Sequence, residues 1–199
     1  MKNLSQVNMK FENGHEWFFV FVSILIFCLF FACSNPKQRI EDDIKKLCSQ
    51  RIAIPYDYFQ EYKGNEKVET ERLTSPFKLI VYNDSSQCTT CAINHMDVWV
   101  PLLDSLASFE GKIEVAFIFS PKREDYANLT HRARLPFPIY VDSSCAFSQM
   151  NKNLPANAMM HTFLLNEKDS VILVGDPVRN ERIKDLLLDI LKSKERTVS

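Results

Sequence analysis

The stretch FKLIVYNDSSQCTTCA, residues 77–92, joins the two patterns that decide the fold of this chain. Its first seven residues, 77–83, form a short and nearly continuous apolar run, which predicts a strand buried on both faces. The polar continuation ends in Cys88 and Cys91, which are separated by two threonines. This spacing fits a redox pair, half of a metal site or a structural disulfide.

A helical pattern follows directly, over about residues 91–109. Pro101 lies inside it and predicts a kink, because proline lacks the backbone N–H group that a helix interior needs. Cysteines at the start of a helix lie close to free backbone N–H groups and to the positive end of the helix dipole. The apolar face of the predicted helix contains Trp99, Leu102, Leu103 and Leu106, spaced as i, i+3, i+4 and i+7.

The remaining patterns alternate between strand and helix. Two further apolar runs predict buried strands, and a polar turn near the end predicts an antiparallel hairpin. Asn180 is expected to cap a closing helix with one apolar face. The predicted elements are strands at 112–120 and 137–142 around a helix at 124–134, hairpin strands at 160–166 and 170–175, and a helix with Ile183, Leu187, Ile190 and Leu191 on one face.

The first 32 residues have the pattern of an export signal. Residues 18–32, FFVFVSILIFCLFFA, carry no charge and are fewer than the roughly 20 apolar residues that span a bilayer. The sequence LFFACSN, residues 29–35, resembles the lipobox of bacterial lipoproteins, and the resemblance implies that Cys33 becomes the acylated N-terminus. Residues 32–34 also fit an ordinary signal-peptide cleavage site, and a retained anchor is the third alternative.

The chain is therefore predicted to have three parts: a lipoprotein signal peptide at 1–32, a lipid-anchored tether and N-terminal extension at 33–76, and a compact domain at 77–196. We expect the mature protein in the cell envelope, anchored to a membrane that faces the periplasm, with the outer membrane favoured. An oxidising compartment permits stable disulfides. After removal of Cys28 and lipidation of Cys33, four cysteines that could pair in three ways remain: Cys48, Cys88, Cys91 and Cys145.

Charge and composition exclude some classes of function. The formal net charge is −1, and acidic and basic residues are interleaved without a basic stripe. Nucleic acid is therefore not expected as a partner. The sequence contains no glycine-rich phosphate loop and no second Cys-x-x-Cys, so we expect neither a cofactor nor a metal.

The order of strand, Cys-x-x-Cys at a helix start, helix, strand, helix, hairpin and helix resembles the thioredoxin fold over residues 77–196. The resemblance implies an α/β domain with a central mixed sheet flanked by helices. Together with the N-terminal anchor, the chain is similar to membrane-attached bacterial proteins of the redoxin and thiol-disulfide interchange type. The resemblance implies a thiol-disulfide oxidoreductase whose partners are protein thiols and disulfides of the cell envelope.

In such a fold, Cys88 is the exposed attacking thiolate and Cys91 resolves the mixed disulfide. The intervening Thr89 and Thr90 depart from the Gly-Pro pair common in thioredoxins. Tyr82 stands where many thioredoxins bury an acid.

A further departure lies in the loop that faces the cysteines. Met160 occupies the position of the cis-proline of the family, and His161 follows it. Pro155 lies five residues earlier and is a poorer match to the proline. The resemblance therefore places Met160 and His161 opposite the redox pair.

Three other interpretations of these residues stay open. A structural Cys88–Cys91 disulfide would make the protein a non-catalytic lipoprotein that holds a partner. Thiolate, thioether and imidazole groups of the cysteines, Met159, Met160 and His161 would suit Cu(I). A thiol peroxidase needs a threonine and a proline before the reactive cysteine, where this chain has Ser85 and Val81. Cys145 would then be a distant resolving thiol, unless it pairs with Cys48 or is a small apolar core residue.

Overall fold

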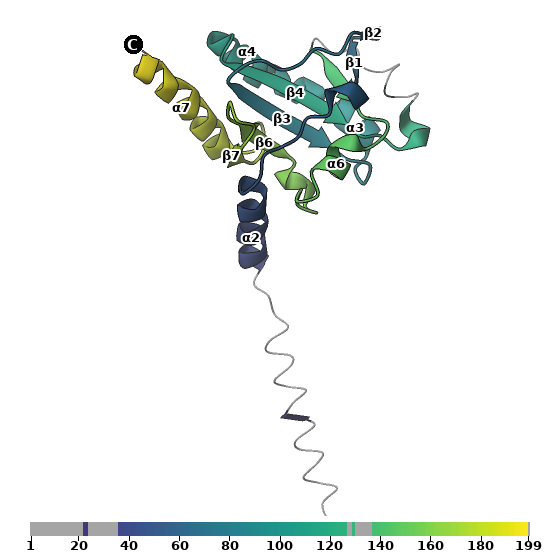
Figure 1. Cartoon of the computed structure of the whole chain (residues 1–199), viewed down its shortest axis with the longest axis vertical. Helices are drawn as coiled ribbons and strands as arrows, with labels where there is room; N and C mark the ends of the chain where they lie inside the picture. The colour runs from purple at the N-terminus through teal and green to yellow at the C-terminus, as the bar shows by residue number, and fades with distance from the viewer. Residues whose placement is uncertain (1–21, 24–35, 127–128, 130–136, 199) are drawn as a thin grey trace, which may run out of the picture. The chain divides into compact units, whose positions relative to one another are not determined.

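The computed structural model describes residues 22–23, 36–126, 129 and 137–198 (Figure 1). The chain divides into two units, Met1–Glu41 and Asp42–Ser199, and the domain lies in the second. Helix α2, Pro36–Cys48, crosses the division between them. In the described part of the chain, no helix combines the length and the apolar character that a membrane crossing requires. The predicted lipidation site, Cys33, lies outside the described residues.

The domain is built on one mixed sheet of seven strands with β3 and β4 near its centre (Figure 1). Strands β3, β4 and β5 are parallel, and the other pairings are antiparallel. This is a thioredoxin-like fold, as the sequence predicted. In spatial order the strands are β2 (Glu66–Val68), β1 (Gln60–Lys63), β5 (Ile139–Val141), β4 (Ile113–Phe119), β3 (Phe77–Asn83), β6 (Thr162–Leu165) and β7 (Val171–Val174).

The sheet separates two apolar layers because side chains of a strand alternate between its faces. Leu79 of β3 belongs to one layer and Ile80, the next residue, to the other. The first layer includes Leu102 and Leu106 of helix α4 (Val100–Leu106) and Leu187 and Leu191 of helix α7 (Glu181–Val198). The second includes Phe147 of helix α6 (Ala146–Met150) and Leu47, Ile52 and Phe59 of the N-terminal extension.

The prediction of a single helix after the cysteines is wrong. The chain forms α3 (Thr89–Asn94), a 3-10 turn η2 (Met96–Trp99), α4 and a second 3-10 turn η3 (Ala107–Phe109). The interruption falls at His95, whose φ of −110° and ψ of 16° are not helical, rather than at Pro101. Pro101 lies in the first turn of α4, where its missing N–H group has no helical partner to lose.

The other predicted helices have two different outcomes. Asn180 caps α7 as expected, since its side-chain oxygen accepts hydrogen bonds from the backbone N–H groups of Arg182 (3.0 Å) and Ile183 (3.3 Å). The helix predicted at 124–134 begins as a 3-10 turn, η4 (Arg123–Asp125), and most of its remainder lies outside the described residues. Helix α6 was not predicted.

The N-terminal extension adds two strands that were not predicted. A two-residue turn joins β1 to β2, and Gly64 in this turn has a φ of +63°, which favours glycine. A 3-10 turn, η1 (Tyr56–Tyr58), precedes β1. The sheet thus continues into residues 33–76, which were predicted to lie outside the compact domain.

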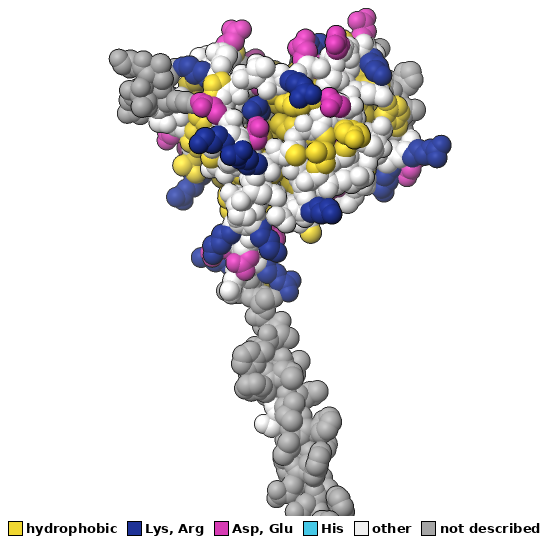
Figure 2. All heavy atoms as spheres, viewed as in Figure 1, with side chains coloured by type: hydrophobic (Ala, Val, Ile, Leu, Met, Phe, Trp, Pro, Cys, Tyr) yellow, Lys and Arg dark blue, Asp and Glu magenta, His cyan; other side chains and the backbone are white. Residues whose placement is uncertain are grey.

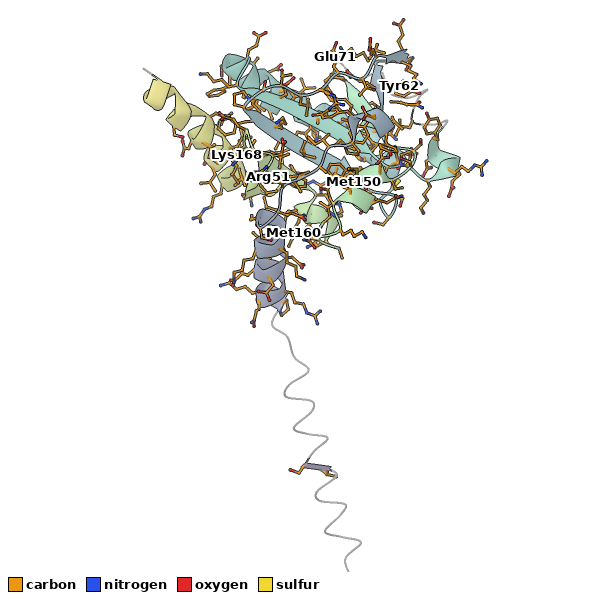
Figure 3. The ribbon with its side chains drawn as sticks, in the orientation of Figure 1. Arg51, Tyr62, Glu71, Met150, Met160 and Lys168 are labelled. Atoms are coloured by element: carbon orange, nitrogen blue, oxygen red, sulfur yellow. A yellow bond between two sulfur atoms is a disulfide. The ribbon has the colours of Figure 1, made fainter. Side chains whose placement is uncertain are left out.

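Residues 51–53 of the extension lie along the domain as a short strap. Arg51 pairs with Ser170, and the N–H group of Ile52 donates to the carbonyl of Asp169 at 2.8 Å. Asp169 lies in the turn between β6 and β7, and Figure 3 shows Arg51 beside Lys168 of this turn. The strap is therefore bonded to the hairpin turn at one edge of the sheet.

Candidate active site at the Cys88–Cys91 pair

A tight turn connects β3 to α3 and carries the two cysteines. β3 ends at Asn83, and Asp84 begins a turn in which its carbonyl accepts from the N–H group of Gln87 at 3.1 Å. The Asp84 carboxylate also accepts from the N–H group of Ser86 at 2.8 Å. Cys88 follows as the N-terminal cap of α3. A strand, a turn with side-chain hydrogen bonds and a helix start thus fix the position of Cys88.

Cys88 and Cys91 form a disulfide with their Cα atoms 5.2 Å apart. The N–H group of Cys91 donates to the sulfur of Cys88 at 3.2 Å. A donor aimed at this sulfur stabilises a thiolate there after reduction. Both residues are exposed, so a partner can reach either sulfur. The backbone donor, rather than access, distinguishes the sulfur of Cys88 from that of Cys91.

The residues around the disulfide include buried polar groups without partners. Thr89 is only 1% exposed, and its hydroxyl has no hydrogen-bond partner among the described residues. Asn83 donates to the side-chain oxygen of Gln87 at 3.2 Å. The second polar atom of each of these amides, Asn83 Oδ1 and Gln87 Nε2, is buried and unpaired within the described part of the chain. The threonines stand inside the Cys-x-x-Cys motif and were predicted to lie at the site, whereas no motif marks this amide pair and it was not predicted.

Tyr82 occupies the position where a buried acid was expected by resemblance. Its hydroxyl donates to Ser120 at 3.2 Å, and Ser120 donates to Asp142 at 3.2 Å. Burial raises the pKa of the Tyr82 phenol, and hydrogen bonds with Ser120 and Ser148 oppose the rise. Asp142, which is fully buried, also accepts from the N–H groups at the start of α6. The Asp142 carboxylate is therefore linked to the Tyr82 hydroxyl by hydrogen bonds through Ser120.

The loop before β6 is built around a buried histidine. Met160 ends a 3-10 turn, η5 (Ala158–Met160), and is buried, whereas Met159 is 71% exposed. All peptide bonds of the described residues are trans. His161 is 3% exposed, and its Nε2 lies 2.8 Å from the carbonyl oxygen of Pro155. Figure 3 labels Met160 in this loop. Its position opposite the cysteines stays a prediction.

His161 instead contacts the turn that carries the cysteines. Its Nδ1 lies 3.5 Å from Oδ2 of Asp84. The carbonyl of His161 accepts from the N–H group of Tyr82 at 3.0 Å, which extends the pairing of β6 with β3. His161 was a predicted site residue, but its contact with Asp84 was not predicted, because 76 residues separate the two (positions 85–160) and only the strand pairing brings them together.

The geometry gives no support to a metal site or to a Cys48–Cys145 disulfide. Among the described residues, no group of three or more His, Cys, Asp or Glu side chains is arranged to hold a metal ion. Both ring nitrogens of His161 face oxygen atoms of the protein. Cys48 and Cys145 are free thiols and do not pair with each other. Burial raises the pKa of both thiols, and for Cys145 the carboxylates of Asp142 and Asp84 raise it further.

Comparison with known proteins gives weak structural likenesses. No protein-family model and no curated protein sequence matches the chain. Peroxiredoxin Q of Xanthomonas campestris is similar with a TM-score of 0.46 and 16% identity, over 72% of this chain and 95% of that one. A Chlorobium tepidum protein assigned as thiol:disulfide interchange protein DsbE has a TM-score of 0.44 and 15% identity, over 59% and 82%. A thioredoxin-like protein of Bacteroides caccae has a TM-score of 0.43 and 16% identity, over 78% of this chain and 56% of that one.

Proposed function

We propose that this chain is a thiol-disulfide oxidoreductase that acts on protein thiols and disulfides through Cys88 and Cys91. One observation carries the proposal: an exposed disulfide at the start of α3, with a backbone N–H group aimed at the sulfur of Cys88. Thiolate formation at an accessible sulfur is the chemical requirement for exchange. Structural disulfides have no comparable need for exposure or for a donor at one sulfur.

The exchange takes place in two steps. The Cys88 thiolate attacks one sulfur of a substrate disulfide, which forms a mixed disulfide and releases the other substrate sulfur as a thiolate. The Cys91 thiolate then attacks the sulfur of Cys88, closes the Cys88–Cys91 bond and releases the second substrate thiolate. Two electrons pass from the Cys88–Cys91 dithiol to the substrate, and two protons balance the substrate thiolates. The reverse sequence oxidises a substrate dithiol.

Turnover by the full chain in detergent tests the proposal. A fluorescently labelled peptide disulfide serves as substrate, with glutathione as the reductant that regenerates the dithiol. Cys88→Ser is expected to abolish turnover, and Cys91→Ser is expected to accumulate the mixed disulfide, which mass spectrometry detects. Cys145→Ser is the matched control, because it removes a free thiol of the same domain. Unchanged turnover in Cys88→Ser would refute the proposal.

The same assay distinguishes a peroxidase. Replacing the peptide disulfide by hydrogen peroxide or an alkyl peroxide measures oxidation of the Cys88–Cys91 dithiol by that class of substrate. For an oxidoreductase of protein disulfides, we expect the peptide to oxidise the dithiol at least about tenfold faster than either peroxide. The opposite order would assign the site to peroxide reduction.

We also propose that the protein works in the cell envelope, attached to a membrane by a lipid on Cys33. The support is the apolar segment 18–32 and the lipobox-like sequence at 29–35. Several acyl chains would anchor it firmly, because each buried CH₂ contributes about 0.8 kcal/mol. Intact-mass analysis of membrane-extracted protein is expected to show an N-terminus at Cys33 with added acyl mass. An unmodified N-terminus at Ser34 or Asn35 would refute the anchor and leave the exchange reaction untouched.

A further inference from the structure

Two amide side chains span the turn between β3 and α3. Asn83 is the last residue of β3, and its Nδ2 donates to Oε1 of Gln87 at 3.2 Å. Gln87 comes immediately before Cys88 in the chain. The hydrogen bond therefore joins the end of a central strand to the residue that precedes the first cysteine of the pair.

Asn83 is held firmly in the sheet. Its carbonyl accepts from the N–H group of Ser120 at 2.8 Å, which continues the pairing of β3 with β4. Its side chain lies on the same face of β3 as that of Val81, because side chains alternate along a strand. That face packs in the apolar layer that contains Ile93 of α3. The Asn83 amide thus meets Gln87 from a fixed position on the side of the sheet to which α3 belongs.

A continuous series of contacts leads from this hydrogen bond to the sulfur. Gln87 is joined to Cys88 by a peptide bond, and Cys88 is the N-terminal cap of α3. The Cys88 sulfur accepts from the N–H group of Cys91 at 3.2 Å. A second hydrogen bond of Gln87, from its N–H group to the carbonyl of Asp84 at 3.1 Å, lies within the turn and fixes its shape. The bond to Asn83 differs from it, because it ties the Cys88 end of the turn to the strand.

The amide pair is unfavourable for stability. Asn83 Oδ1 and Gln87 Nε2 are buried and have no partner within the described residues. Exchanging nitrogen and oxygen in both amides would still leave one hydrogen bond, one unpaired donor and one unpaired acceptor. Apolar side chains of similar shape, leucine and methionine, would avoid the cost of burying unpaired polar atoms. Stability therefore does not account for amides at these two positions.

Buried polar atoms without partners are concentrated around Cys88. Five such side-chain atoms occur in the described part of the chain, and three of them belong to Asn83, Gln87 and Thr89. Groups that lower stability are retained where a functional site needs them. Their concentration on both sides of Cys88 favours a role at this cysteine over a role in the fold.

We infer that Asn83 and Gln87 are positioning residues for thiol-disulfide exchange. Their hydrogen bond holds Cys88 at the end of β3, so that its sulfur stays aligned with the N–H group of Cys91. Without this bond the turn has more freedom, the alignment is lost for part of the time, and a thiolate on Cys88 loses part of its stabilisation. The inference rests on the proposed function, because it requires that Cys88 attack a substrate.

The double variant Asn83→Leu/Gln87→Met separates positioning from stability. It removes the hydrogen bond together with both unpaired atoms and keeps side chains of similar size. We expect the full chain in detergent to unfold at a urea concentration no lower than that of the unsubstituted chain, because the removed atoms were unfavourable. Each single variant leaves one amide wholly unpaired and should unfold at a lower urea concentration.

Alkylation by iodoacetamide at one fixed pH reports on the sulfur of Cys88. Mass spectrometry of the fully reduced chain measures the alkylation rates of Cys88 and Cys145 in one sample, so the free thiol of Cys145 serves as internal reference. We expect the ratio of the two rates to fall about fivefold in the double variant and in each single variant. The double variant should lose no more than either single variant, because the same bond is lost in all three.

Asn166→Leu is the matched control. Asn166 fixes the turn between β6 and β7 by accepting from the N–H groups of Lys168 at 2.9 Å and Ser170 at 3.1 Å. It lies near the start of β3, whereas the cysteines follow the end of that strand. We expect Asn166→Leu to unfold at a lower urea concentration and to keep the alkylation ratio of the unsubstituted chain.

Three results would overturn the inference. The first is an unchanged alkylation ratio in the double variant, and the second is an equal fall of the ratio in Asn166→Leu, which would reflect a general loss of stability. The third is a double variant less stable than the unsubstituted chain, because the amides would then serve the fold. Alkylation needs no substrate, so failure of the proposed function is read separately, as turnover that survives Cys88→Ser.

Discussion

Asn151 joins the N-terminal strap to the domain and gives the sharpest test of the fold. It follows α6 and is 2% exposed. Its amide oxygen accepts from the N–H group of Ala53 at 2.9 Å, and its amide nitrogen donates to the carbonyls of Ala53 and Phe147, both at 2.8 Å. One side chain thus pairs with the strap as a neighbouring strand would.

Replacing Asn151 by alanine removes all three bonds. Each hydrogen bond contributes about 0.5–1.5 kcal/mol net, and a buried group left unpaired costs about 1–3 kcal/mol. Because Ala53 is only half-buried, water can hydrogen-bond to some of the backbone groups that lose Asn151 as a partner, which lowers the cost. We expect a loss of about 2–4 kcal/mol in the free energy of unfolding. With a urea m value of about 2 kcal/mol/M, the unfolding midpoint falls by about 1–2 M.

Urea unfolding followed by tryptophan fluorescence and circular dichroism measures this loss. Asn157→Ala is the matched control, because the half-buried Asn157 side chain accepts one backbone N–H group, from Met159 at 3.1 Å. It should cost about 0.5–1 kcal/mol. If Asn151→Ala cost no more than the control, the strap would not belong to the cooperative unit and our account of the extension would be wrong.

Three further predictions concern the site and its surroundings. Thr89→Val should stabilise the domain by about 1 kcal/mol in urea unfolding, because it removes a buried unpaired hydroxyl, whereas half-buried Thr90→Val should change stability by less than about 0.5 kcal/mol. Burial raises the pKa of Tyr62 to about 12. Above the unfolded value of about 10, the tyrosine ionises in the unfolded chain before it does in the folded one, so the free energy of unfolding falls as the pH rises. Tyr62→Phe should reduce this fall, as measured by urea unfolding at alkaline pH. After reduction, mass spectrometry should show Cys88 alkylated about tenfold faster than Cys145, since a backbone N–H group faces the Cys88 sulfur and burial raises the pKa of the Cys145 thiol; equal rates would contradict this account.

The central strands were predictable because burial on both faces requires continuous apolar runs in the sequence. The run at 77–83 coincides with β3, and the run at 112–120 contains β4 with one extra residue at each end. Strands covered on both faces need apolar side chains at every position, and few other elements have that pattern. A polar turn between two apolar runs located β6 and β7.

The β1–β2 hairpin was missed because its apolar pattern is weak. Its strands, QEYK and EKV, are mostly polar, and the buried Glu61 is paired with the N–H group of Glu71 rather than with apolar neighbours. The one usable local signal was Gly64-Asn65, a dipeptide that favours two-residue hairpin turns. Pairing of β1 with β5 joins segments far apart in the sequence, so no local pattern encodes it.

At the candidate site, too, features set by neighbouring residues were predictable and contacts between distant segments were not. Cys-x-x-Cys after a buried strand predicted the position of the disulfide and its helix start, both of which are local. The contact of His161 with Asp84 depends on the register of β6 against β3 and was not predictable. The interrupted helix after the cysteines was also missed, because η2 and α4 keep the apolar spacing of a continuous helix.

Figure 2 shows basic and acidic side chains interspersed over the described surface in that view, as expected for a chain near charge balance.

Sheet edges affect solubility separately from surface charge, because an unpaired edge strand can pair with a strand of another chain. One edge of the sheet is β2, three residues with exposed Glu66 and Lys67, and the other edge is β7. A chain cut at residue 77 would lose β1 and β2 and leave the buried, apolar β5 as the edge. The hairpin therefore shields this edge of the sheet from intermolecular strand pairing, and we expect such a shortened chain to aggregate.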